Sequence, residues 1–364
     1  MAGFFISPAK LVLFNSFGGK RYDDSPRAVF EAMRDDPRFA GWRFVWAFHE
    51  PSRFTVEGAQ CIRTDSMQYF LTALRARIWI TNSGIERGLS FKSRHTLYVN
   101  TWHGSTMKKM GNDIPQDNES FRTRGRMSDD IMLAQSEEQA DIFSRVFVIP
   151  RSHFRIYGLP RNDRLCHVTA ADCMAARERL GLPADRRVIL YAPTFREYDR
   201  DDTGCIMRPP LDLARWDHEL SSQYVLLFRA HYEVAHVLGV TDSDFVHNVT
   251  DYPVLDDLML ASDLLISDYS SIFYDYSLLG RPMLHYCYDY EKYDAERGLY
   301  FDIRQYLDGS ETETGLLELL SHFDKKREQQ RLRDFRKRFA LADGEATPRL
   351  LDEIYSRIDK RSRK

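Results

Sequence analysis

The sequence predicts an α/β protein with two doubly wound domains, each a parallel sheet covered by helices on both faces. Short apolar runs typical of buried strands alternate with amphipathic helical patterns along most of the chain. Near residues 158–168 this alternation stops and then begins again, which divides the chain into two similar series. The length of 364 residues suits two domains of ordinary size.

The first series opens with the apolar run Lys10–Phe14, a turn, and a helix beginning near Pro26. The turn Gly18–Lys20 lacks the spacing of a P-loop or of GxGxxG, so we expect a plain strand-to-helix connection. The next predicted elements are a helix at Ser66–Ala76 and strands at Arg43–Phe48, Arg77–Thr81, Thr96–Asn100, Ile131–Ala134 and Phe154–Ile156. They define an N-terminal domain over residues 1–160.

The second series begins with a helix at Ala170–Leu180, which ends at Gly181, and a strand at Arg187–Tyr191. Further strands are predicted at Tyr224–Phe228, Phe245–Asn248, Leu264–Ser267 and Met283–Tyr286, and charged helices at Leu316–Phe339 and Ala346–Ile358. We expect a second domain over 161–345, with a C-terminal helix and basic tail over 346–364. Ligands of doubly wound sheets bind at the carboxyl ends of the strands, so we expect the active site in the cleft between the domains.

Composition narrows the class of protein. With 51 basic and 54 acidic residues the net charge is -3, which disfavours a nucleic-acid binder driven by bulk charge. The five cysteines contain no CxxC pair and no histidine spacing suits a metal, so we expect neither a disulfide framework nor a metal site nor a cofactor. No run is long enough to span a bilayer and no secretory signal is visible, which predicts a cytoplasmic protein.

The stretch that follows the predicted strand Leu264–Ser267 is the first candidate for a binding site. It reads Asp268-Tyr-Ser-Ser and then a short helix with Gly280 after its end. Ser270 or Ser271 at the N-cap places hydroxyls and backbone N–H groups at the positive end of the helix, which suits a phosphate. Serines that only cap an ordinary helix explain the same pattern, so the stretch alone leaves both interpretations open.

Histidines follow predicted strands in both domains. His103 comes after the strand ending at Asn100, with Gly104 giving close backbone access and Lys108 and Lys109 within a helical turn. A histidine at a strand end can take a proton from an attacking hydroxyl, although one that only hydrogen-bonds a loop would look the same.

In the second domain His231 follows a strand in the same way, with Arg229 two residues earlier. Arg196, after the first strand of that domain, and Arg161, in the turn between the domains, are candidate phosphate ligands because a guanidinium presents a planar fork of donors.

Taken together, these motifs resemble the CDP-glycerol glycerophosphotransferase family, which builds teichoic acids and related capsule polymers. The similar segments occur in the family's order from about residue 14 to residue 347: FNSFGGKRYDDSPRA, WITNS, NTWHGSTMKKMG, QSEEQADIFSRVF, YGLPRND, YAPTFR, FRAHY, ISDYSSIFYDYSLLGRPM, YDYEKY, RGLYFD and ADGEAT. The resemblance implies a GT-B-like fold whose C-terminal domain holds CDP-glycerol and whose N-terminal domain meets the acceptor. It also implies that His103 is the base and that His231, Ser270 and Ser271 hold the donor phosphates.

The implied reaction moves glycerol phosphate to a hydroxyl of a lipid-linked polyol-phosphate or saccharide acceptor and releases CMP. Such an acceptor would bring the enzyme to the inner face of the cell membrane, where basic residues meet anionic headgroups: Lys108, Lys109, Arg122, Arg124, Arg126 and the tail Lys360–Lys364. Three alternatives stay open, namely a CDP-ribitol transferase of the same family, a nucleotide-sugar glycosyltransferase or epimerase on the same fold, and a non-catalytic assembly subunit.

Overall fold

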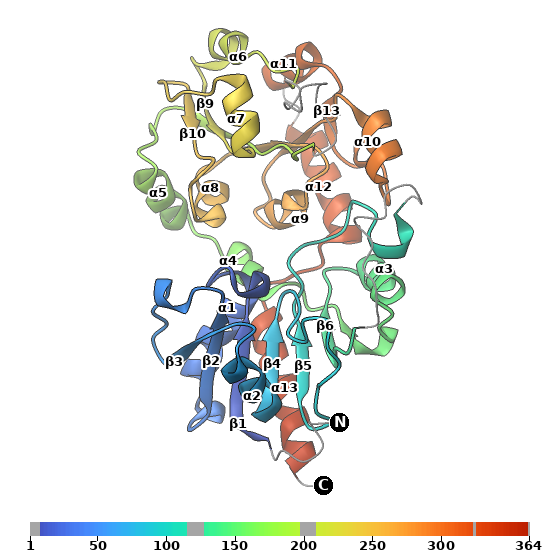
Figure 1. The fold of residues 1–364 in the computed structure, drawn as a ribbon. Coiled ribbons are helices and arrows are strands. Elements are labelled where there is room, and N and C mark those ends of the chain that lie inside the picture. The colour runs from blue at the N-terminus through green and yellow to red at the C-terminus, as the bar shows by residue number, and fades with distance from the viewer. Residues whose placement is uncertain (1–7, 115–126, 197–208, 323–324, 363–364) are drawn as a thin grey trace. The chain divides into compact units, whose positions relative to one another are not determined.

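A computed structural model describes residues 8–114, 127–196, 209–322 and 325–362. Its contacts divide the chain into two compact units, the first formed by residues 1–105, 123–166 and 341–364 and the second by 106–122 and 167–340. In the described part, each unit contains one parallel sheet, of seven strands in the first and six in the second (Figure 1). The predicted fold class, two doubly wound α/β domains, is therefore confirmed.

The first sheet has the order β3-β2-β1-β4-β5-β6-β7, and its described pairings are parallel. Its strands are β1 (Ala9–Asn15), β2 (Arg43–Phe48), β3 (Ala59–Arg63), β4 (Ala76–Thr81), β5 (Leu97–Asn100), β6 (Ile131–Leu133) and β7 (Phe154–Arg155). The strand order reverses between β1 and β4. Such a switch point opens a crevice at the carboxyl ends of the strands, where α/β proteins bind their ligands.

The helices of the first unit are α1 (Asp24–Asp35), α2 (Met67–Arg75), α3 (Glu137–Phe147), α4 (Asp163–Cys166) and α13 (Ala346–Ser362). Serines begin two of them, because the Ser66 hydroxyl accepts from Tyr69 N–H in α2 and that of Ser136 from Gln139 N–H in α3. The connection between β1 and α1 is the turn predicted around Gly18.

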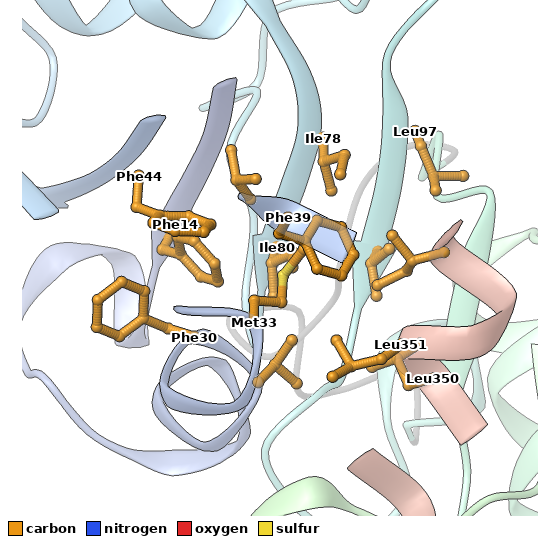
Figure 2. Packing of buried hydrophobic residues seen from close by; sticks show 14 of the residues in the cluster. Phe14, Phe30, Met33, Phe39, Phe44, Ile78, Ile80, Leu97, Leu350 and Leu351 are labelled. Atoms are coloured by element: carbon orange, nitrogen blue, oxygen red, sulfur yellow. The ribbon is translucent and has the colours of Figure 1, made fainter. Parts of the chain in front are cut away.

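Aromatic side chains fill the core between this sheet and helices α1 and α13 (Figure 2). The Phe14 ring packs edge-on against Phe30 and stacks on Trp46, with centroid distances of 5.3 Å in both cases. Leu350 and Leu351 of α13 are buried in the same cluster. Each such side chain contributes about 1.5–3 kcal/mol when removed from water, so the last helix completes the core of the first unit.

The second sheet has the order β10-β9-β8-β11-β12-β13. Its strands are β8 (Arg187–Tyr191), β9 (Tyr224–Phe228), β10 (Val246–Asn248), β11 (Leu264–Ser267), β12 (Met283–Tyr286) and β13 (Asp308–Ser310). The helices are α5 (Ala170–Arg179), α6 (Leu213–Leu220), α7 (Tyr232–Leu238), α8 (Leu255–Ala261), α9 (Ile272–Ser277), α10 (Tyr290–Arg297), α11 (Glu313–Ser321) and α12 (Lys325–Phe339). The switch point of this sheet lies between β8 and β11.

The structure differs from the sequence expectations in a few elements. Strands β3 and β13 were not predicted, and the helical segment expected at Leu316–Phe339 is two helices, α11 and α12. The C-terminal segment 346–364, set apart in the predicted domain limits, belongs to the first unit by its contacts. No helix among the described residues is long and apolar enough to cross a bilayer.

Candidate active site

His103 lies beyond the carboxyl end of β5, one strand away from the switch point of the first sheet. The chain leaves β5 through Trp102, whose φ of 53° is in the left-handed region and whose N–H donates to Asn100 Oδ1 at 2.9 Å. A left-handed tryptophan is sterically unfavourable, and it is stabilised here by this local hydrogen bond. The bend fixes where the next residue begins.

The His103 ring has a defined tautomer. Its Nδ1 lies 2.7 Å from the backbone oxygen of Asn82, and because a carbonyl only accepts, Nδ1 carries the proton and Nε2 keeps its lone pair. The ring stacks on Trp102 at 4.3 Å, while the residue as a whole remains exposed. The surrounding protein lowers the pKa of His103 by desolvation, so the imidazole is neutral near pH 7.

An ion pair lies directly behind this histidine. Arg161 Nη1 donates to the backbone oxygen of His103 at 2.9 Å and pairs with Asp24 Oδ2 at 2.6 Å. Asp24 has a left-handed φ of 64°, and its side chain is only 5% exposed. Its charge acts to raise the pKa of His103, against the larger effect of burial. Arg161 thus contacts the backbone of the predicted base, and Asp24 is a residue that sequence analysis missed.

Gly104 is held by a buried amide network. Its backbone oxygen accepts from Gln139 Nε2 at 3.0 Å, and Gln139 Oε1 accepts from the N–H of Gln135 at 2.7 Å. Gln135 Nε2 in turn donates to Ser105 Oγ at 2.7 Å. These bonds connect the loop after β5 to helix α3. The segment 101–110 is not helical, and Lys108 and Lys109 belong to the second unit, where both make backbone contacts near Leu299.

In the second unit, Asp268 organises the turn after β11. Its Oδ1 accepts from the N–H groups of Thr194 at 2.8 Å and of Tyr269 at 2.6 Å, while Oδ2 pairs with Arg196 at 2.5 Å. Asp268 therefore joins the loop after β8 to the loop after β11, on both sides of the switch point. This arrangement ties together two predicted site residues.

Arg196 is buried in a cluster of carboxylates and tyrosines. It is 4% exposed and binds both oxygens of Asp289 at 2.9 Å, in addition to Asp268. The rings of Tyr269, Tyr288 and Tyr293 lie 5.0–5.2 Å from its guanidinium carbon. Burial acts to lower the pKa of Arg196, but the two carboxylates raise it well above its usual range. Most of its N–H groups are already bonded within the protein.

Three hydroxyl groups lie in the same two loops. Ser271 is the N-cap of α9 without a side-chain capping bond, and Ser270 Oγ accepts from the N–H of Ile272 at 3.3 Å. Both serines are partly exposed. Thr194 Oγ1 is buried and has no hydrogen-bond partner among the described residues. A buried hydroxyl without a partner is unusual, which makes Thr194 a further candidate ligand that the sequence analysis did not select.

His231 follows β9, next to β8 in the sheet. Its ring stacks on Phe195 with centroids 4.1 Å apart, so it lies beside the loop that carries Thr194 and Arg196. Arg229 instead donates through Nη1 to the backbone oxygens of Tyr252 at 2.7 Å and Val249 at 3.4 Å. The predicted site residues of the second domain therefore all follow strands β8, β9 and β11, at the carboxyl edge of the second sheet.

Within the described residues, no three histidine, cysteine or acidic side chains gather as metal ligands would. The predicted site residues fall into two groups by unit: His103, Gly104 and Arg161 in the first, and Arg196, Arg229, His231, Asp268, Ser270 and Ser271 in the second.

Comparison with known proteins identifies relatives over the whole chain. The chain is 32% identical to a teichoic acid glycerol-phosphate transferase of Staphylococcus aureus, over 95% of this chain and 92% of that protein. It is also 32% identical to a teichoic acid poly(glycerol phosphate) polymerase of Staphylococcus epidermidis, and there it spans 96% of this chain but only 51% of the relative.

Similar solved structures also include a teichoic acid enzyme. The wall teichoic acid polymerase TagF superposes with a TM-score of 0.84 at 30% identity, over 98% of this chain and 90% of that one. A UDP-N-acetylglucosamine 2-epimerase from Listeria monocytogenes, at 14% identity and a TM-score of 0.57, shares the GT-B-like fold alone. The family model described as CDP-glycerol:poly(glycerophosphate) glycerophosphotransferase matches residues 4–356. The chain therefore belongs to the CDP-glycerol:poly(glycerophosphate) glycerophosphotransferase family.

Proposed function

We propose that this protein transfers glycerol phosphate from CDP-glycerol to a hydroxyl of a lipid-linked teichoic-acid or capsule-type acceptor and releases CMP. Family membership and a structure of TagF soaked with CDPG support the donor. The observation that carries the proposal is the state of His103. Its Nδ1 proton is donated to Asn82, its Nε2 is unprotonated, and the residue is exposed one strand away from a switch point.

In the proposed reaction, Nε2 of His103 accepts the proton of the acceptor hydroxyl as its oxygen attacks the β-phosphorus of CDP-glycerol. The new bond joins the acceptor oxygen to that phosphorus. The bond between the β-phosphorus and the bridging oxygen breaks, and CMP leaves with this oxygen. Arg161 and Asp24 position the base through its backbone.

The donor phosphates would be held by His231, Ser270 and Ser271, joined by the hydroxyl of Thr194. A partly exposed serine pair at the start of α9 offers hydroxyl and backbone N–H donors to phosphate oxygens. In this proposal Asp268 and Arg196 act by holding the loops after β8 and β11 together.

Arg229 is assigned a similar positioning role, because its guanidinium donates to two backbone oxygens near the end of β10. Gly104 would leave room for the acceptor next to the base, since it has no side chain.

We further propose that the enzyme works on the inner face of the cell membrane as a peripheral protein. Of the basic residues expected to meet anionic lipid, the structure describes Lys108, Lys109, the exposed Lys360 and the helical backbone of Arg361. Arg122, Arg124, Arg126 and the last two residues of the tail lie outside the described part. Flotation with vesicles of anionic and of neutral lipid tests this, and equal recovery with both would contradict it.

The experiment that tests the function is CMP release from CDP-glycerol, compared with CDP-ribitol and a UDP-sugar, with a lipid-linked glycerol-phosphate acceptor. Loss of a general base typically lowers kcat by 10²–10⁴-fold, so His103→Ala and His103→Gln should fall by about this factor. His95→Ala is the matched control, because this exposed histidine precedes the same strand β5. Release with another donor only, or full turnover by His103→Ala, would contradict the proposal.

A further inference from the structure

A cavity of about 490 Å³ lies at the carboxyl ends of β2 and β3, on the edge side of the first sheet. It is lined by His49, Glu50, Arg63, Thr64, Asp65 and Ser66. In a parallel sheet all carboxyl ends face the same edge, so this cavity opens on the edge that also carries His103. The mechanism above does not use it.

One of the positively charged side chains around this cavity is not paired with a carboxylate. Asp65 is neutralised by Arg87 through two bonds of 2.9 and 2.8 Å, and Glu50 lies 3.8 Å from Arg53. Arg63 is exposed, and its guanidinium has no ion-pair or hydrogen-bond partner among the described residues. A guanidinium with free donors binds phosphate oxygens as a planar fork.

Other polar side chains supplement this arginine. Thr64 Oγ1 and His49 Nδ1 share a hydrogen bond of 2.9 Å, which orients the imidazole at the cavity wall. Ser66 also lines the cavity and caps the nine-residue helix α2, so the positive end of that helix lies there as well. Cavity, unpaired arginine and helix end together form a site for an anionic group.

One turn connects this cavity to the proposed base. His49 N–H donates to the backbone oxygen of Gly19 at 2.8 Å, and a Cβ on Gly19 would come within 2.7 Å of the Thr64 methyl group. In the same turn the Phe17 ring lies 5.8 Å from the His103 ring. The turn Phe17–Gly19 therefore contacts both the residues of the cavity and the ring of His103.

We propose that the cavity is an acceptor subsite that binds a phosphodiester of a polyol-phosphate chain, upstream of the hydroxyl that reacts. This inference rests on the proposed function, since it assigns the acceptor a repeating phosphodiester. In this proposal Arg63 binds the phosphodiester, so the enzyme distinguishes acceptors that carry a phosphodiester from acceptors that lack it.

The test is binding of a glycerol-phosphate trimer to the full chain, measured by titration calorimetry without donor. Arg63→Gln should raise the Kd about tenfold, as expected for loss of an exposed charge-assisted hydrogen bond. Arg43→Gln is the matched control, because Arg43 is an exposed arginine at the opposite end of β2, also without a partner among the described residues. Equal affinities of the two variants, or no binding by the unsubstituted protein, would overturn the subsite.

Two further arms separate the possible outcomes. Inorganic phosphate that binds as tightly as the trimer would show a general anion site, and this too would overturn the assignment. CMP release by the unsubstituted protein reports on the proposed function independently. Turnover with a KM for the trimer that is unchanged in Arg63→Gln therefore refutes the subsite alone, whereas no turnover with any donor refutes the function.

Discussion

Replacement of Arg196 by methionine gives the sharpest test of how the second unit is built. The substitution keeps most of the side-chain volume but leaves the carboxylates of Asp268 and Asp289 buried without their cation. Removing one partner of a buried ion pair destabilises a protein by about 3–5 kcal/mol. For a unit of roughly 150–250 residues each kcal/mol lowers the Tm by about 2–4 °C, so we expect a decrease of about 6–20 °C.

Differential scanning calorimetry of the full chain measures this decrease directly. Arg187→Met is the matched control, because Arg187 is exposed in the same sheet and bonds only neutral groups, Gln223 and the ring of Tyr224. Its Tm should change by about 2 °C or less. The triple variant that adds Asp268→Asn and Asp289→Asn should recover much of the loss, since no charge of this cluster then remains buried.

The reasoning is refuted if Arg196→Met melts like Arg187→Met. A normal melting temperature together with a raised KM for CDP-glycerol would assign the guanidinium to the donor phosphates, as the sequence alone suggested. The two roles are thus separated by two measurements on one variant.

Two other perturbations follow from titrating groups. Asp24→Asn should lower the pKa of His103, because Asp24 acts to raise it, and the acid limb of the kcat/KM profile should therefore move to lower pH. The rate should also fall about tenfold, because Arg161 loses its ion-pair partner. The control Asp23→Asn should leave the acid limb in place. Burial lowers the pKa of His285 to about 4. Below about pH 6.5 this histidine is therefore protonated in the unfolded chain, whereas in the native state it stays neutral until about pH 4. Stability is therefore full above pH 6.5, and the free energy of unfolding should fall by about 2 kcal/mol at pH 5. Urea titrations of His285→Gln should show a weaker pH dependence, and a slope equal to that of the exposed control His218→Gln would contradict this.

Much of the fold could be predicted because its strands are buried on both faces. Strands such as β8 and β9 read as continuous apolar runs, and their predicted bounds match the structure. Strand β3 is an edge strand in which only Ile62 is buried, and β13 is the sequence Asp-Gly-Ser, so neither carries an apolar pattern. Pairing with a neighbouring strand, which no local pattern encodes, makes these two segments strands.

The candidate site was predictable in position but not in its contacts. Residues that follow strands in a parallel sheet must meet at one edge, which is why the predicted residues of the second unit gather there. One of the two carboxylate partners of Arg196, however, is Asp289, 93 residues further along the chain. Asp24 likewise depends on a left-handed backbone and on Arg161, 137 residues away. Such pairings arise from tertiary packing, so sequence spacing carries no signal of them.

The position of α13 has a consequence for how the protein is made. The first unit takes its core residues Leu350 and Leu351 from a helix that begins about 180 residues after Cys166. At about 5–20 residues per second, a ribosome needs roughly 10–40 s to synthesise the intervening chain. During that interval the first sheet has emerged with the part of its apolar face that α13 covers still exposed, while the second unit, continuous from 167 to 340 apart from a short earlier segment, can already fold. The nascent chain should therefore depend on chaperones until its last helix is released.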